Sequence, residues 1–240
     1  MATPPGLVLG GMVGSYGYRE PAPGVRETGA RWGLVAGWVQ PVPGGSGWLR
    51  GGLEVATGRL RYQGSGTLDG VPDTRLEGRG VAGQDFLAAP DLVLAPYLGL
   101  GQRQVWDDLR GTTSSGARGY RRETRLVYLP AGGTARMELG GGWTGSFTAE
   151  YDWVLSARAT SRLGDAGTGL DTALTRPGGG HGFRLELNLG RGQLAFGPWL
   201  QGWDMQASDT VPVGQNTFAQ EPANRTREGG LLVTWRFGIL

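Results

Sequence analysis

The residues that could carry out acid–base or nucleophilic chemistry are few in this sequence. His181, in the stretch RPGGGHGF, is the sole histidine, and Ser161 and Asp165 lie in the loop region before it. A serine hydrolase needs a nucleophile, a general base and an orienting group, but the spacing of these residues does not support a triad. Asp107 and Asp108 in VWDDL could act as paired carboxylates, although adjacent aspartates at a strand end more often form a solvated turn.

Metal and phosphate sites have equally little support. With one histidine and no cysteine, a transition-metal site is not expected. Asp165, Asp171 and Asp209 lie in glycine-rich loops without the spacing of a calcium loop. The stretch GTGLDTALTRPGGG lacks the Lys-Ser/Thr and the strand–helix context of a phosphate-binding loop. We therefore expect a protein that is not an enzyme and that holds no cofactor or metal.

Composition indicates a chain with many strands. The 240 residues include 47 glycines and 14 prolines, but also 9 Trp, 7 Tyr and 6 Phe, which fits neither collagen nor disorder. No run of about eighteen apolar residues occurs, so a transmembrane helix is excluded. The net charge of +2 is too small to indicate a nucleic-acid partner. Glycine-rich turns between strands explain this composition best.

The stretch WTGSFTAEYDWVL, residues 143–155, alternates without a break. One face carries Trp143, Phe147 and Tyr151 among other apolar residues, while the other carries Glu150 and Asp152. Successive strand residues point to opposite faces, so one face is apolar and the other polar. Alternation by itself does not say whether the apolar face packs in a soluble core or faces lipid.

Similar segments recur along the chain, and the links between them alternate between short and long. A meander closed into a membrane barrel, with tight turns on one side and long loops on the other, produces this rhythm, whereas a Greek-key sandwich does not. We expect one all-β domain over 1–240, a closed antiparallel up-and-down transmembrane β-barrel of about ten strands, within about eight to twelve. The short links are 41–47, 88–91, 139–142 and 190–192, and the long ones 19–27, 63–73, 107–118, 159–180 and 206–226. The predicted strands are 6–18, 28–41, 47–62, 74–87, 91–106, 119–138, 143–158, 181–190, 192–205 and 227–238.

Aromatic residues gather toward the two ends of the predicted strands. Two aromatic belts around an aliphatic band are expected where rings lie at lipid headgroups, whereas core aromatics would more naturally lie at mid-strand. The predicted belts contain Trp38, Trp48, Trp143, Phe196, Trp235 and Phe237 beside the short turns, and Tyr18, Trp32, Tyr62, Trp106, Tyr120, Trp153, Phe183 and Trp203 toward the long loops.

The final strand, GLLVTWRF, places Val233, Trp235 and Phe237 on one face. Gly230 lies three positions before Val233. It resembles the C-terminal assembly signal of bacterial outer-membrane barrels, except that Gly238, Ile239 and Leu240 follow the last aromatic residue. The stretches YGYREP, GLVAGW, YLP, GGGWTGSFTAEYDWVL, GPWLQGW and EPANRTREGGLLVTWRF resemble a family of outer-membrane β-barrel proteins of unassigned function, small barrels of OmpA-like or porin-like type. This resemblance implies the barrel fold and a periplasmic N-terminus, and it implies no activity.

If the apolar face of each strand points toward lipid, the alternate positions of the strand point into the lumen. The charged residues at these alternate positions are therefore the predicted lumen residues. Buried charges must be paired or hydrated, and a barrel of about ten strands is close to the size that side chains fill. We expect a structural ion-pair network, with a charge-lined conduit as the alternative. The predicted lumen residues are Arg31, Arg50, Glu54, Arg75, Glu77, Arg79, Arg103, Arg136, Glu138, Glu150, Asp152, Arg184, Glu186 and Arg236.

Three functions remain open at this point. The first is a non-enzymatic outer-membrane barrel that acts through its external loops, the second a narrow porin-like channel for small polar solutes, and the third an outer-membrane enzyme acting on lipid or peptide. The expected partners are outer-membrane lipid, lipopolysaccharide and envelope proteins, with no nucleic acid. All basic residues are arginine, and those in or beside the long loops are expected to form a collar that binds lipopolysaccharide phosphate, with a merely solvated loop face as the alternative. The collar residues are Arg19, Arg26, Arg59, Arg61, Arg118, Arg121, Arg122, Arg158, Arg162, Arg176, Arg225 and Arg227. MATPPGLVLGG is not a signal peptide, so a mature chain is expected.

Overall fold

A computed structural model of the protein describes residues 2–22, 24–167 and 169–238. Within these ranges, ten long strands form a closed antiparallel barrel, as predicted. Ile239 and Leu240, which follow the predicted assembly signal, lie outside the described residues. The wall consists of β1 (Gly6–Glu20), β2 (Val25–Pro41), β3 (Gly47–Gly64), β4 (Gly66–Gln84), β6 (Leu92–Asp108), β7 (Arg121–Gly140), β8 (Trp143–Arg162), β10 (Gly180–Arg191), β11 (Leu194–Met205) and β14 (Asn224–Phe237).

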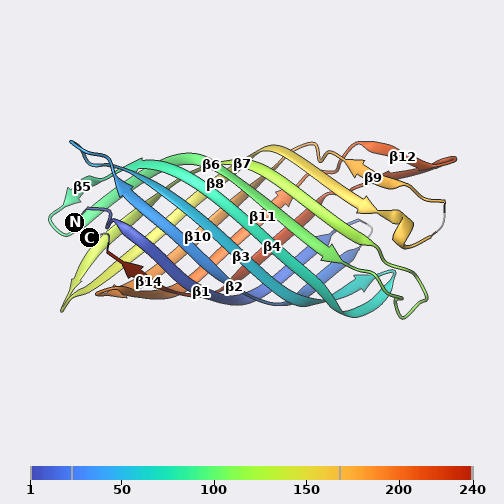
Figure 1. Ribbon diagram of the computed structural model, residues 1–240, viewed down its shortest axis with the longest axis horizontal. Helices are drawn as coiled ribbons and strands as arrows, with labels where there is room; N and C mark the ends of the chain where they lie inside the picture. Colours follow the sequence, from blue (N-terminus) through green and yellow to red (C-terminus); the bar gives the residue numbers. More distant parts are fainter. Residues whose placement is uncertain (1, 23, 168, 239–240) are drawn as a thin grey trace.

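The barrel closes because its first and last strands pair. Each wall strand pairs antiparallel with the next one along the chain, and β14 pairs with β1 from Leu7↔Phe237 to Arg19↔Arg225. The strands cross the molecule obliquely, as Figure 1 shows, which is the tilt that closing a sheet requires. No wall strand among the described residues therefore keeps a free edge.

The start of β1 and the end of β14 lie at one end of the cylinder, which also carries β5 (Phe86–Ala89) (Figure 1). We call this the terminal end, and the opposite end the loop end. The loop end carries β9 (Thr172–Thr175) and the hairpin of β12 (Thr210–Gly214) and β13 (Thr217–Gln220). A single 3-10 turn, η1 (Leu163–Asp165), follows β8. No helix in the described part of the chain is of the length and apolarity that a membrane span requires.

Two of the predicted long links are wrong, because the strands continue through them. The link predicted at 63–73 is occupied by β3 and β4, which turn at Ser65, and the link at 19–27 contains only a tight turn between β1 and β2. Tyr16, Tyr18, Leu60, Val71 and Leu109 pack together inside this extension. Their burial stabilises strand pairing beyond the length that crosses a bilayer, which is about 9–11 residues.

The two faces of the wall differ in the way that a membrane barrel requires. On β8, Phe147, Trp153 and Leu155 are exposed on the outside, whereas Glu150 and Asp152 are buried inside. The apolar face of the alternating stretch therefore points outward. Exposed Leu, Val, Trp and Phe side chains cover the exterior of the other wall strands as well. Such a large apolar surface is stable in lipid rather than in water.

The aromatic belts are present, but several predicted members belong to the lumen. Trp38, Trp143, Phe196, Trp235 and Phe237 point outward near the terminal end, and Trp153 and Phe183 point outward nearer the loop end. Trp48 is 2% exposed and faces inward, so its assignment to a belt is wrong. The reason is parity: Trp48 lies two positions from Arg50 and shares its face. Tyr18, Tyr62 and Trp203 also face inward.

Candidate functional site: the barrel lumen

Charged side chains line the lumen, and most of them are residues that the alternation along the strands predicts to face inward. Ion pairs inside the barrel involve Arg31, Glu54, Arg75, Glu77, Arg79, Arg103, Arg136, Glu150, Arg184 and Glu186. Arg50 faces inward over the ring of Trp48, and Arg236 donates to the carbonyl of Pro4. Asp152 is buried and forms no ion pair with any residue that the structure describes. Glu138 is exposed at the end of β7, so its placement in the lumen is wrong: the strand there reaches beyond the enclosed part of the wall.

Glu77 lies at the centre of this network. Its carboxylate contacts Arg184 at 2.7 Å, Arg103 at 3.1 Å and Arg75 at 3.5 Å, and it accepts a 2.7 Å hydrogen bond from the Tyr128 hydroxyl. Glu77 and these partners, on β4, β6, β7 and β10, are almost completely buried. A buried carboxylate is stable only with such compensation.

Several ion pairs cross the full width of the lumen. Arg103 on β6 contacts Glu228 on β14 at 2.6 Å, and Arg184 on β10 contacts Glu54 on β3 at 2.7 Å. In each pair, the two strands lie on opposite sides of the ring of wall strands. Arg31 on β2 joins the first pair through a 3.1 Å contact with Glu228. The arginine and glutamate side chains thus occupy the space that a conduit would need.

The terminal end of the lumen is covered by the start of the chain. Thr3 donates from its backbone and, at 2.6 Å, from its hydroxyl to Asp85, which also accepts from Arg136 at 2.6 Å and from Trp48 at 3.1 Å. Burial alone would raise the pKa of Asp85, but the hydrogen bonds from Thr3 and Arg136 outweigh it and lower that pKa. Asp85 is therefore ionised at neutral pH and links Thr3 to Arg136 and Trp48 at this end.

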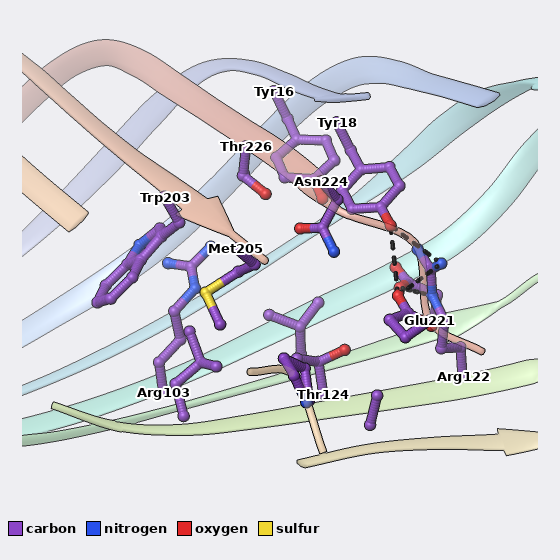
Figure 2. Close-up of a pocket in the computed structure, with 15 residues that line it drawn as sticks. Tyr16, Tyr18, Arg103, Arg122, Thr124, Trp203, Met205, Glu221, Asn224 and Thr226 are labelled. Atoms are coloured by element: carbon purple, nitrogen blue, oxygen red, sulfur yellow. Dashed lines mark hydrogen bonds and ion pairs between the residues drawn. The ribbon is translucent and has the colours of Figure 1, made fainter. Parts of the chain in front are cut away.

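The loop end contains a small pocket around Arg122 (Figure 2). Arg122 contacts Glu20 at 3.1 Å and Glu221 at 3.5 Å, and the Tyr18 hydroxyl donates to Glu20 at 2.6 Å. Trp203 forms part of the opposite wall (Figure 2). Burial raises the pKa of Glu221, and the charge of Arg122 opposes this shift. The pocket has a volume of about 50 Å³, which is enough for a few water molecules.

Several residues that lie in the lumen were not predicted to do so. For some of them, the alternation of inward and outward residues along their strand would have indicated the inward face. Asp73 shares the inward face of Arg75, and Glu228 shares that of Arg236. They were missed because they lie beside or within the segments that were expected to form long loops. The missed residues are Glu20, Glu27, Asp73, Asp107, Arg122, Glu221 and Glu228.

The residues considered for catalysis do not meet. His181 points outward, with its side chain 49% exposed and its ring stacked on Tyr151 at 5.6 Å. Ser161 is buried on the inward face of β8, and Asp165 is held by Arg121, whose hydrogen bonds lower the pKa of this carboxyl. No catalytic triad forms from these three residues.

The adjacent aspartates also separate. Asp107 is buried on the inward face of β6, whereas Asp108 lies on the outward face and pairs with Arg110 at 2.6 Å. They therefore do not act as a carboxylate pair. Among the described residues, no group of His, Cys, Asp and Glu is arranged to hold a metal ion.

The two lumen carboxylates of the alternating stretch are expected to differ in their contribution to stability. Glu150 contacts Arg79 and Arg184 and accepts a 2.8 Å hydrogen bond from Tyr97, whereas Asp152 forms no ion pair within the described part of the chain. Glu150→Ala should therefore lower the free energy of unfolding by about 1–3 kcal/mol, and Asp152→Ala by much less. The measurement is the temperature at which the folded, fast-migrating band is lost on a gel. Equal shifts for both variants would contradict this assignment.

Comparison with known proteins supports the fold. The Escherichia coli outer membrane protease OmpT has 12% identity and a TM-score of 0.57, with 99% of this chain and 98% of that chain covered. The translocator domain of the autotransporter NalP from Neisseria meningitidis has 12% identity and a TM-score of 0.46, with 98% and 90% covered. The Pseudomonas putida toluene transporter TodX has 10% identity and a TM-score of 0.38, with 98% and 89% covered. The last two similarities are too weak to support an argument.

No protein-family model matches the sequence, and no curated protein matches it. At these identities, the similarity to OmpT concerns the fold alone. The protein has the fold of bacterial outer-membrane β-barrels, and its apolar exterior is suited to that membrane.

Proposed function

We propose that the protein is a sealed, non-enzymatic outer-membrane barrel that acts through the surfaces at its loop end. The observation that carries this proposal is the set of ion pairs between opposite walls, Arg103–Glu228 and Arg184–Glu54. A pore needs a continuous hydrated path, and these contacts cross the middle of the lumen. The cover formed by Thr3 and Asp85 supports the same conclusion at the terminal end.

Conductance in planar bilayers tests this proposal directly. The refolded protein is expected to give no stable single-channel steps, because the ion pairs between opposite walls interrupt a continuous water-filled path through the middle of the lumen. The variant Arg184→Ala, combined with Glu54→Ala, removes one of the crossing pairs without leaving its partner unpaired, and serves to show that an opened lumen would be detected. Reproducible steps from the wild-type protein would favour the porin-like alternative instead.

A second candidate function is hydrolysis at the loop end. Asp73 and Asp107 are register partners on β4 and β6, both are buried, and each has a carboxylate oxygen without a hydrogen-bond partner among the described residues. Paired carboxylates in unequal environments are an arrangement that acid–base catalysis uses. The fold of OmpT, an outer membrane protease, is compatible with this candidate. Hydrolysis of casein or phospholipid by the wild type, lost in Asp107→Asn, would support it.

A further inference from the structure

Three arginines lie side by side on the outside of the barrel, near the loop end. Arg19 on β1 is the register partner of Arg225 on β14 and of Arg26 on β2. All three are exposed on the outward face. Residues directly opposite each other on paired strands have Cβ atoms about 4.5–5.5 Å apart, and like charges at this distance destabilise the sheet. We call Arg225, Arg19 and Arg26 the arginine row.

The protein does little to neutralise this row. Neither Arg19 nor Arg26 forms an ion pair with any carboxylate that the structure describes. Arg225 contacts Asp204, but Asp204 also pairs with Arg227 at 2.6 Å and therefore serves two guanidinium groups. An anion from outside the chain would relieve the repulsion between the guanidinium groups.

The position of the row relates it to one leaflet of the membrane. Along β1, the outward residues change from Leu9 and Val13 to Ser15, and Arg19 lies last. On β2, Trp32 and Leu34 belong to the apolar band, and Arg26 lies beyond them toward the loop end. The short turns of bacterial barrels face the periplasm, so the loop end faces outward. The row therefore lies beyond the apolar band, at the polar surface of the outer leaflet.

We propose that the arginine row binds the phosphate groups of lipopolysaccharide. Guanidinium groups bind phosphate oxygens in bidentate geometry, and adjacent arginines can share one anion. Lipopolysaccharide carries its phosphates in the polar region of the outer leaflet, and the row lies on that side of the apolar band. The proposal concerns the outer surface of the wall and holds whether or not the lumen conducts.

The row consists of three members of the expected arginine collar, whereas Arg121 and Arg122, two other members, are engaged within the protein. Arg122 is buried in the lumen with Glu20 and Glu221, so its assignment to the exterior is wrong. Arg121 is half-buried and forms a bidentate pair with Asp165 at 2.8 Å. Reversal of these two charges would disturb the lumen and a loop, and would not test phosphate binding.

The test compares two double charge reversals in protein refolded in detergent without lipopolysaccharide. The test variant is Arg19→Glu/Arg26→Glu. The matched control is Arg59→Glu/Arg162→Glu, which changes the same charge at two exposed outward positions on β3 and β8 whose register partners, Ala30, Pro72 and Thr172, carry no charge. Each protein is mixed with deep-rough lipopolysaccharide at low ionic strength, and the lipopolysaccharide that co-elutes in size exclusion is quantified. Lipid A from which the phosphates have been removed serves as the control ligand.

The test variant is expected to retain about tenfold less lipopolysaccharide than the wild type, with the difference reduced at high salt. The control variant should stay within about twofold of the wild type, since it leaves the row intact. Heat-modifiable migration verifies folding, and Arg19→Gln/Arg26→Gln replaces the test variant if the reversal does not fold. Equal retention by all proteins, equal loss in both variants, or wild-type binding that does not depend on the phosphates would each overturn the proposal.

Discussion

Replacement of Glu77 by alanine is expected to lower the free energy of unfolding by about 3–5 kcal/mol. Its carboxylate is shared by Arg75, Arg103 and Arg184, and Glu77 itself is 2% exposed. Removing it leaves positive charges facing one another at a place that water does not reach. Arg184 keeps Glu54 and Arg103 keeps Glu228, so the barrel should still fold in detergent, but it should lose the fast-migrating form at a lower temperature.

Two controls show whether this loss comes from charge. Glu138→Ala removes the same group from an exposed position at the strand end and should leave the transition unchanged. Glu77→Gln keeps the size of the side chain and the hydrogen bond from Tyr128 but removes the charge, so it should be nearly as destabilising as the alanine variant. If Glu77→Ala melts like the wild type, the lumen is hydrated and the case for a sealed barrel fails.

Gly230→Val is expected to cost at least about 3 kcal/mol, because the seam that closes the barrel has no room for a side chain there. A Cβ atom on Gly230 would lie 1.9 Å from the Val13 carbonyl oxygen and 2.4 Å from the Gly14 Cα. Both are backbone atoms of β1, the strand that pairs with β14. The strands would have to separate at this point. The folded fraction after refolding in detergent measures the effect.

The matched control is Gly11→Val on the outward face of β1, where the nearest atom to an added Cβ is 3.9 Å away. It should fold as the wild type does. Gly230 also belongs to the predicted assembly signal, and refolding in detergent separates the two roles because no assembly machinery is present. Normal refolding of Gly230→Val in detergent, with failure only in cells, would assign Gly230 to assembly and contradict the steric explanation.

The wall of the barrel could be predicted from the amino-acid sequence alone. Its signal is local: in β8, the two-residue period of a strand separates Phe147 and Trp153 from Glu150 and Asp152 without reference to any other segment. The same parity placed Glu77, Arg103 and Arg184 inside. The prediction that Trp48 belongs to an outer aromatic belt did not follow this alternation and was wrong, because Trp48 shares the inward face of Arg50.

Which lumen charges meet, and where the strands end, could be seen only in the folded barrel. Arg184 contacts Glu54 and Glu77, which lie across the lumen more than a hundred residues away in the chain. Such contacts depend on the number and stagger of strands around the closed wall, and no single segment encodes these quantities. The extension of β3 and β4 depends likewise on packing between Leu60, Val71 and Tyr18. The alternation of inward and outward residues is a property of a single strand, so it can be predicted from a short stretch of sequence. The ion-pair partners of a lumen residue lie on other strands, so they are fixed only when the wall closes.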